Sequence, residues 1–75
     1  MQTNYKQLDL NRILLYLQKH PISTVDAIMQ ESGAEPLRVY PRLFELAQER
    51  KIRIVEETAW GAPLKVELSS EEIDA

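Results

Sequence analysis

The side chains best suited to chemistry in this sequence form a cationic cluster in the middle of the chain. Residues 38–53 carry five cations against two carboxylates, a local charge of +3. Arginine and lysine bind phosphate groups, and arginine also reads guanine edges in the major groove. The cluster therefore indicates nucleic acid as a candidate partner. Its cations are Arg38, Arg42, Arg50, Lys51 and Arg53.

The net charge of −3 argues against a nucleic-acid partner, but most of it belongs to one end of the chain. Residues 67–75 hold four carboxylates and no cation, so residues 1–66 carry +1. A short acidic end is typical of a solvated, frayed terminus. We therefore divide the chain into a folded domain over residues 1–68 and an acidic tail over residues 69–75.

Residues that support catalysis or hold a metal are sparse. The chain has no cysteine, and its only histidine, His20, falls in an expected turn. The acidic pairs Glu56–Glu57 and Glu71–Glu72 are adjacent and exposed by pattern, so nothing indicates the desolvation that tunes an acid/base couple. Two glycines cannot make a glycine-rich phosphate loop. We predict a protein that is not an enzyme and that has no cofactor and no metal site.

The length and composition limit the fold to one small domain. The chain has 75 residues, of which 44% are hydrophobic and 28% charged, as in ordinary globular domains. A chain of this size buries only about 60% of its unfolded surface, which suffices for one core. The longest apolar run, residues 13–17, is far below the roughly 20 residues of a membrane span. With no secretory signal in the first residues, we expect a cytoplasmic protein.

The spacing of apolar residues predicts two helices in the first half of the chain. Asp9 is a candidate N-cap for a helix over residues 10–19. A variant capping box, Ser23 with Asp26, opens a second helix, and Gly33 supplies its left-handed end. The residues expected on the buried faces are Leu10, Ile13, Leu14, Leu17, Val25, Ile28 and Met29.

A third helix is predicted within residues 36–50. Pro41 would interrupt its hydrogen bonding, so the helix either begins near Pro41 or is kinked there. The buried side of this helix is expected to carry Val39, Leu43, Leu46 and Ala47.

Alternating apolar and charged residues then predict two strands, over residues 52–56 and 64–68. The intervening residues 57–63 contain Gly61 and Pro63, which are typical of a turn. The two strands form an antiparallel hairpin, which must pack one face on the helices because a lone hairpin is marginal in water. That face is Ile52, Ile54, Leu64, Val66 and Leu68. The predicted fold class is α+β, mostly helical.

Three helices followed by a two-stranded hairpin resemble the winged helix-turn-helix domains, as a small stand-alone member. The resemblance is carried by STVDAIMQESG, VYPRLFELAQERKIRIVEE and LKVEL, and it extends over residues 9–68. Such domains commonly bind double-stranded DNA as transcriptional regulators, and many others serve as protein-interaction modules. The resemblance therefore implies either role.

For DNA binding, the third helix would enter the groove and the hairpin would hold the backbone. Arg38 and Arg42 are the candidates for reading bases, with Gln48 as a lesser one. On the same helix, Arg42 and Glu45 are expected to form an i, i+3 pair. The residues expected to hold the DNA backbone are Lys51, Arg53, Lys65 and Trp60. We place this function first, on the basis of the resemblance.

The alternative is a protein-interaction module that uses the outward face of the third helix. That face carries Leu37, Pro41 and Phe44, which suit a protein partner better than DNA. A competing interpretation covers Leu37 and Phe44 with the hairpin or the N-terminal residues, as part of the core. Trp60 in the turn would add an anchor, although we favour its folding back onto the hairpin.

The first helix is apolar over more than one stripe. Leu8, Leu15, Tyr5 and Tyr16 flank its core face. We favour a wide apolar arc that contacts both other helices and the sheet, since the first helix of this arrangement touches all of them. The alternative is a homodimer seam through Leu8, Leu15 and Tyr16, which sedimentation at two concentrations would detect.

Overall fold

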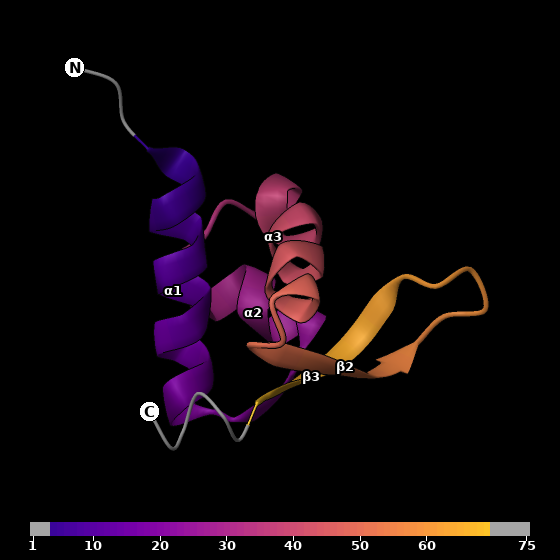
Figure 1. Ribbon diagram of the computed structural model, residues 1–75. Coiled ribbons are helices and arrows are strands. Elements are labelled where there is room, and N and C mark those ends of the chain that lie inside the picture. Colours follow the sequence, from indigo (N-terminus) through magenta and orange to yellow (C-terminus); the bar gives the residue numbers. More distant parts are fainter. Residues whose placement is uncertain (1–3, 70–75) are drawn as a thin grey trace.

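The computed structural model describes residues 4–69 as three helices and a three-stranded antiparallel sheet (Figure 1). The elements are α1 Tyr5–Lys19, β1 Ile22–Thr24, α2 Val25–Glu31, α3 Pro36–Gln48, β2 Ile52–Glu57 and β3 Pro63–Leu68. The predicted α+β class is confirmed, with one strand more than we predicted. Apart from Ser69, the predicted acidic tail lies outside the described residues.

Helix α1 begins five residues earlier than the sequence analysis placed it. The Asn4 side chain accepts a hydrogen bond of 3.1 Å from the backbone N–H of Gln7, so Asn4 is the N-cap. The assignment of the cap to Asp9 is wrong, because Asp9 lies fully buried inside the helix. Asn and Asp are equally good N-cap residues, so the residue type does not distinguish them. The Asp9 carboxylate instead accepts a hydrogen bond from Arg38 of α3.

The start of α2 differs from the prediction by one residue. Thr24 is the N-cap, and its hydroxyl accepts a hydrogen bond of 3.2 Å from the N–H of Ala27. Ser23, the predicted cap, belongs to β1, and its hydroxyl donates to the carbonyl of His20 at 2.6 Å. The left-handed conformation predicted for Gly33 is confirmed by its φ of 86°.

Strand β1 was not predicted, since three residues are too few to show an alternating pattern. It pairs antiparallel with β3, with Ile22 opposite Glu67 and Thr24 opposite Lys65. The predicted hairpin of β2 and β3 is present, and the strand order is β1-β3-β2. The last strand within residues 4–69 is therefore the centre of the sheet.

Helix α3 runs continuously through Pro41 and begins at Pro36. Proline suits the first position of a helix because the N–H it lacks would be unpaired there. Pro41 removes the N–H that would bind the carbonyl of Leu37, but both residues lie on the exposed side, where water can solvate that carbonyl. The option of a helix that starts near Pro41 is therefore wrong.

The end of α3 is closed by Arg50 in the left-handed region, at φ 63°. Its N–H donates to the carbonyl of Ala47 at 3.1 Å, and the N–H of Lys51 donates to the carbonyl of Leu46 at 2.9 Å. This pair of bonds is the Schellman arrangement, which normally places glycine where Arg50 stands. A side chain in this conformation costs roughly 1–2 kcal/mol.

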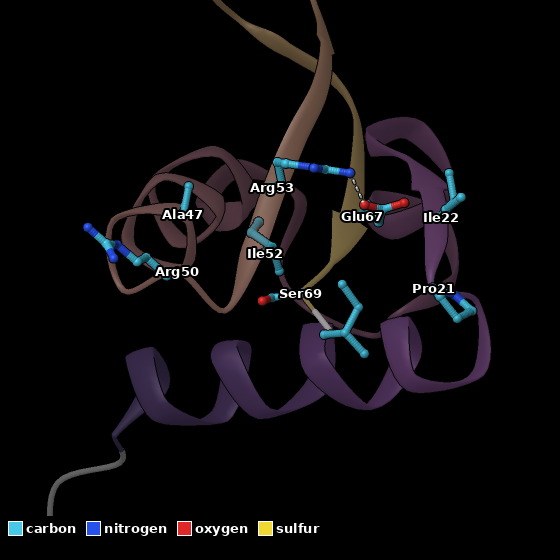
Figure 2. A pocket seen from close by; sticks show the side chains of 9 residues that line it. Pro21, Ile22, Ala47, Arg50, Ile52, Arg53, Glu67 and Ser69 are labelled. Atoms are coloured by element: carbon cyan, nitrogen blue, oxygen red, sulfur yellow. Dashed lines mark hydrogen bonds and ion pairs between the residues drawn. The ribbon is translucent and has the colours of Figure 1, made fainter. Parts of the chain in front are cut away.

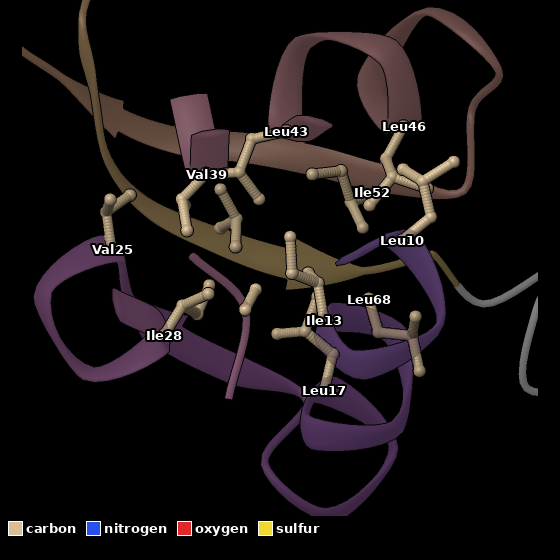
Figure 3. Close-up of a cluster of buried hydrophobic side chains, with 12 residues drawn as sticks. Leu10, Ile13, Leu17, Val25, Ile28, Val39, Leu43, Leu46, Ile52 and Leu68 are labelled. Carbon is tan, nitrogen blue, oxygen red and sulfur yellow. The ribbon is translucent and has the colours of Figure 1, made fainter. Parts of the chain in front are cut away.

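The core lies where the inner faces of the three helices meet the sheet (Figure 3). Every position predicted for it is buried or partly buried except one. Leu64 is 48% exposed, because the β2–β3 hairpin extends beyond the helices (Figure 1). The buried hydrophobic residues are Leu10, Ile13, Leu17, Val25, Ile28, Ala34, Val39, Leu43, Leu46, Ile52, Val66 and Leu68.

Substitution of Arg50 by glycine is expected to stabilise the protein. Arg50→Gly removes the left-handed strain, and after the entropy of glycine in the unfolded chain we expect a gain of about 0.5–1 kcal/mol. Urea denaturation measures the free energy of unfolding. The matched control, Gln48→Gly, places glycine in right-handed helix and should lower that free energy. A loss of stability in Arg50→Gly would contradict the strain assigned here.

Candidate functional site

An ion pair between a buried carboxylate and a guanidinium that is 39% exposed connects the first and third helices. Arg38 Nε donates to Asp9 Oδ2 at 2.6 Å, and the Asp9 side chain is 1% exposed. Arg42 lies beside them, with its Nε 3.9 Å from the same carboxylate oxygen and its Nη1 3.1 Å from Glu45 Oε1. The predicted pair of Arg42 and Glu45 is therefore present. Both arginines expected to read bases are bound to carboxylates of their own chain.

The chemistry of this cluster favours the ionised carboxylate. The hydrogen bond from Arg38 lowers the pKa of Asp9, burial opposes that effect, and the charges of Arg38 and Arg42 reinforce it. The same hydrogen bond raises the pKa of Arg38. The ring of Tyr5 lies against the guanidinium, 5.2 Å from ring centroid to Arg38 Cζ. Arg38 is thus held from two sides, by a carboxylate and by an aromatic face.

The other predicted DNA-contacting cations also face carboxylates. Lys51 Nζ lies 3.7 Å from Glu49, and Lys65 Nζ lies 3.3 Å from Glu56. Exposed pairs of this kind contribute at most about 1 kcal/mol, so a phosphate can compete for them. The Asp9 pair differs, because its release would leave a carboxylate buried and unpaired. The remaining cation, Arg53, pairs with Glu67 across the strands.

The outward side of α3 is apolar and uncovered. Leu37 is 89% exposed and Phe44 45%, with Pro41 exposed between them. The interpretation that places Leu37 and Phe44 in the core is therefore wrong. Tyr40, which the sequence analysis did not single out, is 37% exposed. We call Leu37, Tyr40, Pro41 and Phe44 the α3 face; Gln48, also exposed, lies one turn beyond it.

The turn of the β2–β3 hairpin carries a second exposed apolar residue. Trp60 is 96% exposed, so the expectation that it folds back onto the hairpin is wrong. The turn is closed by hydrogen bonds to Thr58, and the hairpin carries it away from the helices (Figure 1). On the strands behind it, Val55 and Leu64 are also exposed.

The flanks of α1 divide into a packed and an exposed side. Tyr16 packs against the core, and its hydroxyl donates to Glu31 Oε2 at 2.8 Å, which raises the pKa of Tyr16. Leu15 and Leu8 are 59% and 37% exposed. The wide apolar arc is therefore packed at Tyr16 and exposed at Leu15. In the alternative homodimer seam, the Tyr16 hydroxyl would already be bound to Glu31.

A cavity of about 580 Å³ opens where the end of α3 meets the sheet (Figure 2). Arg53 and Glu67 point toward one another on one wall, while the Arg50 side chain points away from them. The two charged groups of that wall therefore satisfy each other. The remaining lining is Pro21, Ile22, Ala47, Ile52, Leu68 and Ser69.

Metal-binding and membrane-spanning features are absent over residues 4–69. No three His, Asp or Glu side chains in that range group together in a way that would hold a metal ion. Within the same residues, none of the helices has both the length and the apolar character of a membrane span.

Comparisons with known proteins return nothing: no family model, no curated protein and no solved structure matches this chain.

Replacement of the buried carboxylate should weaken the fold in a pH-dependent way. Asp9→Asn is expected to lower the free energy of unfolding at pH 7 by about 1.5–3 kcal/mol, the range for hydrogen bonds to charged groups. Because the pKa of Asp9 is lowered from 3.8 in the folded protein, its contribution is present above that value and lost as the pH falls through the folded pKa. The difference between the two proteins should therefore shrink in acid.

Urea denaturation of both proteins between pH 7 and pH 3 measures this difference. The control variant is Glu57→Gln, an exposed position whose free energy of unfolding should change by less than about 0.5 kcal/mol. Equal stability of Asp9→Asn and the wild type at pH 7 would show that the ion pair does not hold the helices together.

Proposed function

We propose that this chain is a winged-helix protein-interaction module that has no catalytic activity of its own and binds its partner through the α3 face. The observation that carries the proposal is how the charged and apolar side chains of α3 are distributed between its two sides. Its arginines turn toward Asp9 and Glu45, whereas Leu37 and Phe44 face solvent. Exposed apolar and aromatic groups that cluster on one helix are typical of protein interfaces.

The order and placement of the elements support the winged-helix assignment. Helices α2 and α3 are joined by a short turn through Gly33, and the β2–β3 hairpin follows α3 directly. The hairpin projects to one side of α3, as a wing would (Figure 1). Strand β1 adds a third strand to the two that the resemblance implies, and it does so without displacing the hairpin.

The chemistry of the α3 face favours a partner with an apolar surface of its own. The four side chains of this face carry no charge, so ionic attraction would contribute little to binding. The exposed areas of Leu37 and Phe44 would instead leave water on association. A partner helix with apolar residues at i, i+3, i+4 and i+7 has the spacing to cover such a stripe.

DNA binding is the second candidate, which reverses the order that the sequence favoured. Its support is the same winged-helix resemblance, together with Lys51, Arg53 and Lys65 at exposed ion pairs that a phosphate can displace. Against it, Arg38 directs its Nε and one Nη to the buried Asp9, which leaves fewer of its donors for a two-bond contact with guanine. The remaining candidate on α3, Gln48, offers one amide group.

Cross-linking tests the proposed interface directly. A photo-cross-linking amino acid at position 37 or 44 should capture the same protein from host extract, and at the α1 position 18 it should not. Affinity for that purified protein should fall about tenfold or more in Leu37→Ala with Phe44→Ala, because two exposed anchors are truncated. The matched control is Leu15→Ala with Gln18→Ala, which truncates two exposed side chains of α1 and should leave this affinity unchanged.

The DNA alternative has a separate test. Heteronuclear NMR titration with mixed-sequence duplexes at about 50 mM salt should move no α3 or hairpin resonance. Micromolar binding that weakens steeply with salt, and that Arg53→Ala with Lys65→Ala reduces, would favour DNA and overturn the proposal.

A further inference from the structure

The tip of the β2–β3 hairpin presents a single tryptophan to solvent. Trp60 is 96% exposed, more than any other large hydrophobic residue described. The tip is the orange loop at the far end of the hairpin from the helices (Figure 1). A Cβ added at the neighbouring Gly61 would meet no heavy atom within 4 Å. The ring therefore stands clear of the protein's own core and contributes nothing to it.

The backbone that carries Trp60 is nevertheless fixed. Thr58 Oγ1 accepts hydrogen bonds from the N–H groups of Trp60 at 3.2 Å and Ala62 at 3.1 Å. The N–H of Thr58 donates to the carbonyl of Ala62, and the N–H of Gly61 donates to the carbonyl of Thr58, both at 2.9 Å. Gly61 adopts φ 88°, which closes the turn. A group held in place before binding loses less entropy when it binds.

The charge of the hairpin indicates whether its tip is suited to a nucleic acid, a lipid surface or a protein. Residues 52–68 hold two cations and three carboxylates, a net charge of −1. Both cations are paired, Arg53 with Glu67 and Lys65 with Glu56. Glu57, next to the tip, has no ion pair within residues 4–69. Residues 58–62 at the tip are uncharged, and the Glu57 carboxylate beside them disfavours nucleic-acid phosphates and anionic lipid headgroups there and favours a cation on a protein surface.

We infer that Trp60 is a preformed anchor that inserts into an apolar pocket of a partner protein, with a Lys or Arg at the pocket rim facing Glu57. This inference rests on the proposed function and names the chemistry of its partner. Tryptophan is the residue type most typical of such anchors, since its ring buries a large area and its N–H donates one hydrogen bond. The pocket therefore also holds an acceptor for the indole N–H.

Trp60 is the only tryptophan of the chain, so intrinsic fluorescence reports on this side chain alone. In the free protein we expect the red-shifted emission of a hydrated indole and full access to acrylamide. A photo-cross-linker at position 60 should capture from host extract the same protein that position 37 captures. Addition of that purified protein should shift the emission to the blue and protect it from acrylamide.

Substitutions distinguish the contribution of the Trp60 ring from those of the Thr58 hydrogen bonds and the Glu57 charge. Trp60→Ala should weaken binding of the purified partner about 30-fold or more, as for an interface hot spot, and Trp60→Phe should weaken it less. Thr58→Val keeps the ring but removes its backbone support, so it should lower affinity by a smaller factor. Glu57→Lys should lower affinity and reverse its dependence on salt. The matched control, Leu15→Ala, removes an exposed side chain of α1 and should change nothing.

The outcomes that overturn this inference differ from those that overturn the proposed function. Cross-linking at position 37 without cross-linking at position 60, or a partner that leaves the emission unchanged, removes the anchor and leaves the α3 interface standing. No capture at either position removes both. A blue shift caused by mixed duplex DNA, by phosphatidylglycerol vesicles or by concentration of the protein alone assigns the tip to another partner.

Discussion

The buried Asp9 carboxylate decides which charged side chains of α3 are available at the protein surface. Buried within α1, it holds the guanidinium of Arg38 at 2.6 Å and lies 3.9 Å from that of Arg42. A buried carboxylate without these cations would be costly, so α3 is constrained to present its arginine side to α1. The apolar side of α3 lies opposite its buried residues Val39, Leu43 and Leu46, so packing of the core turns that side to solvent. The ion pair withdraws the charges of α3, and the core leaves Leu37 and Phe44 exposed.

The core could be predicted because it follows periodicity, which is a local property. Helical spacing identified Ile13, Ile28 and Leu43, and alternation identified the strands that carry Ile52 and Val66. The role of Asp9 could not be obtained in this way. Its position at the start of an apolar pattern is what a helix cap would show, and only its contact with Arg38, 29 residues away, distinguishes the two roles.

The candidate site was harder to predict than the fold for the same reason. A local charge of +3 counts cations, but their availability depends on carboxylates that lie far along the chain, such as Glu67 for Arg53. The exposure of Trp60 was likewise missed, because nothing in the residues around it shows that Thr58 closes the turn upon itself. Most residues of the proposed interface could be named from the sequence, whereas the choice between DNA and a protein partner changed once the ion pairs and exposures were known.

Strand β3 occupies the middle of the sheet although it is the final strand described. Neither β1 nor β2 has a partner until β3 has been made, and the core lacks Val66 and Leu68 until then. The helices therefore keep an open apolar side until β3 pairs with both of its neighbours. Residues 4–69 gain little from folding piece by piece, and we expect them to fold as a single cooperative unit.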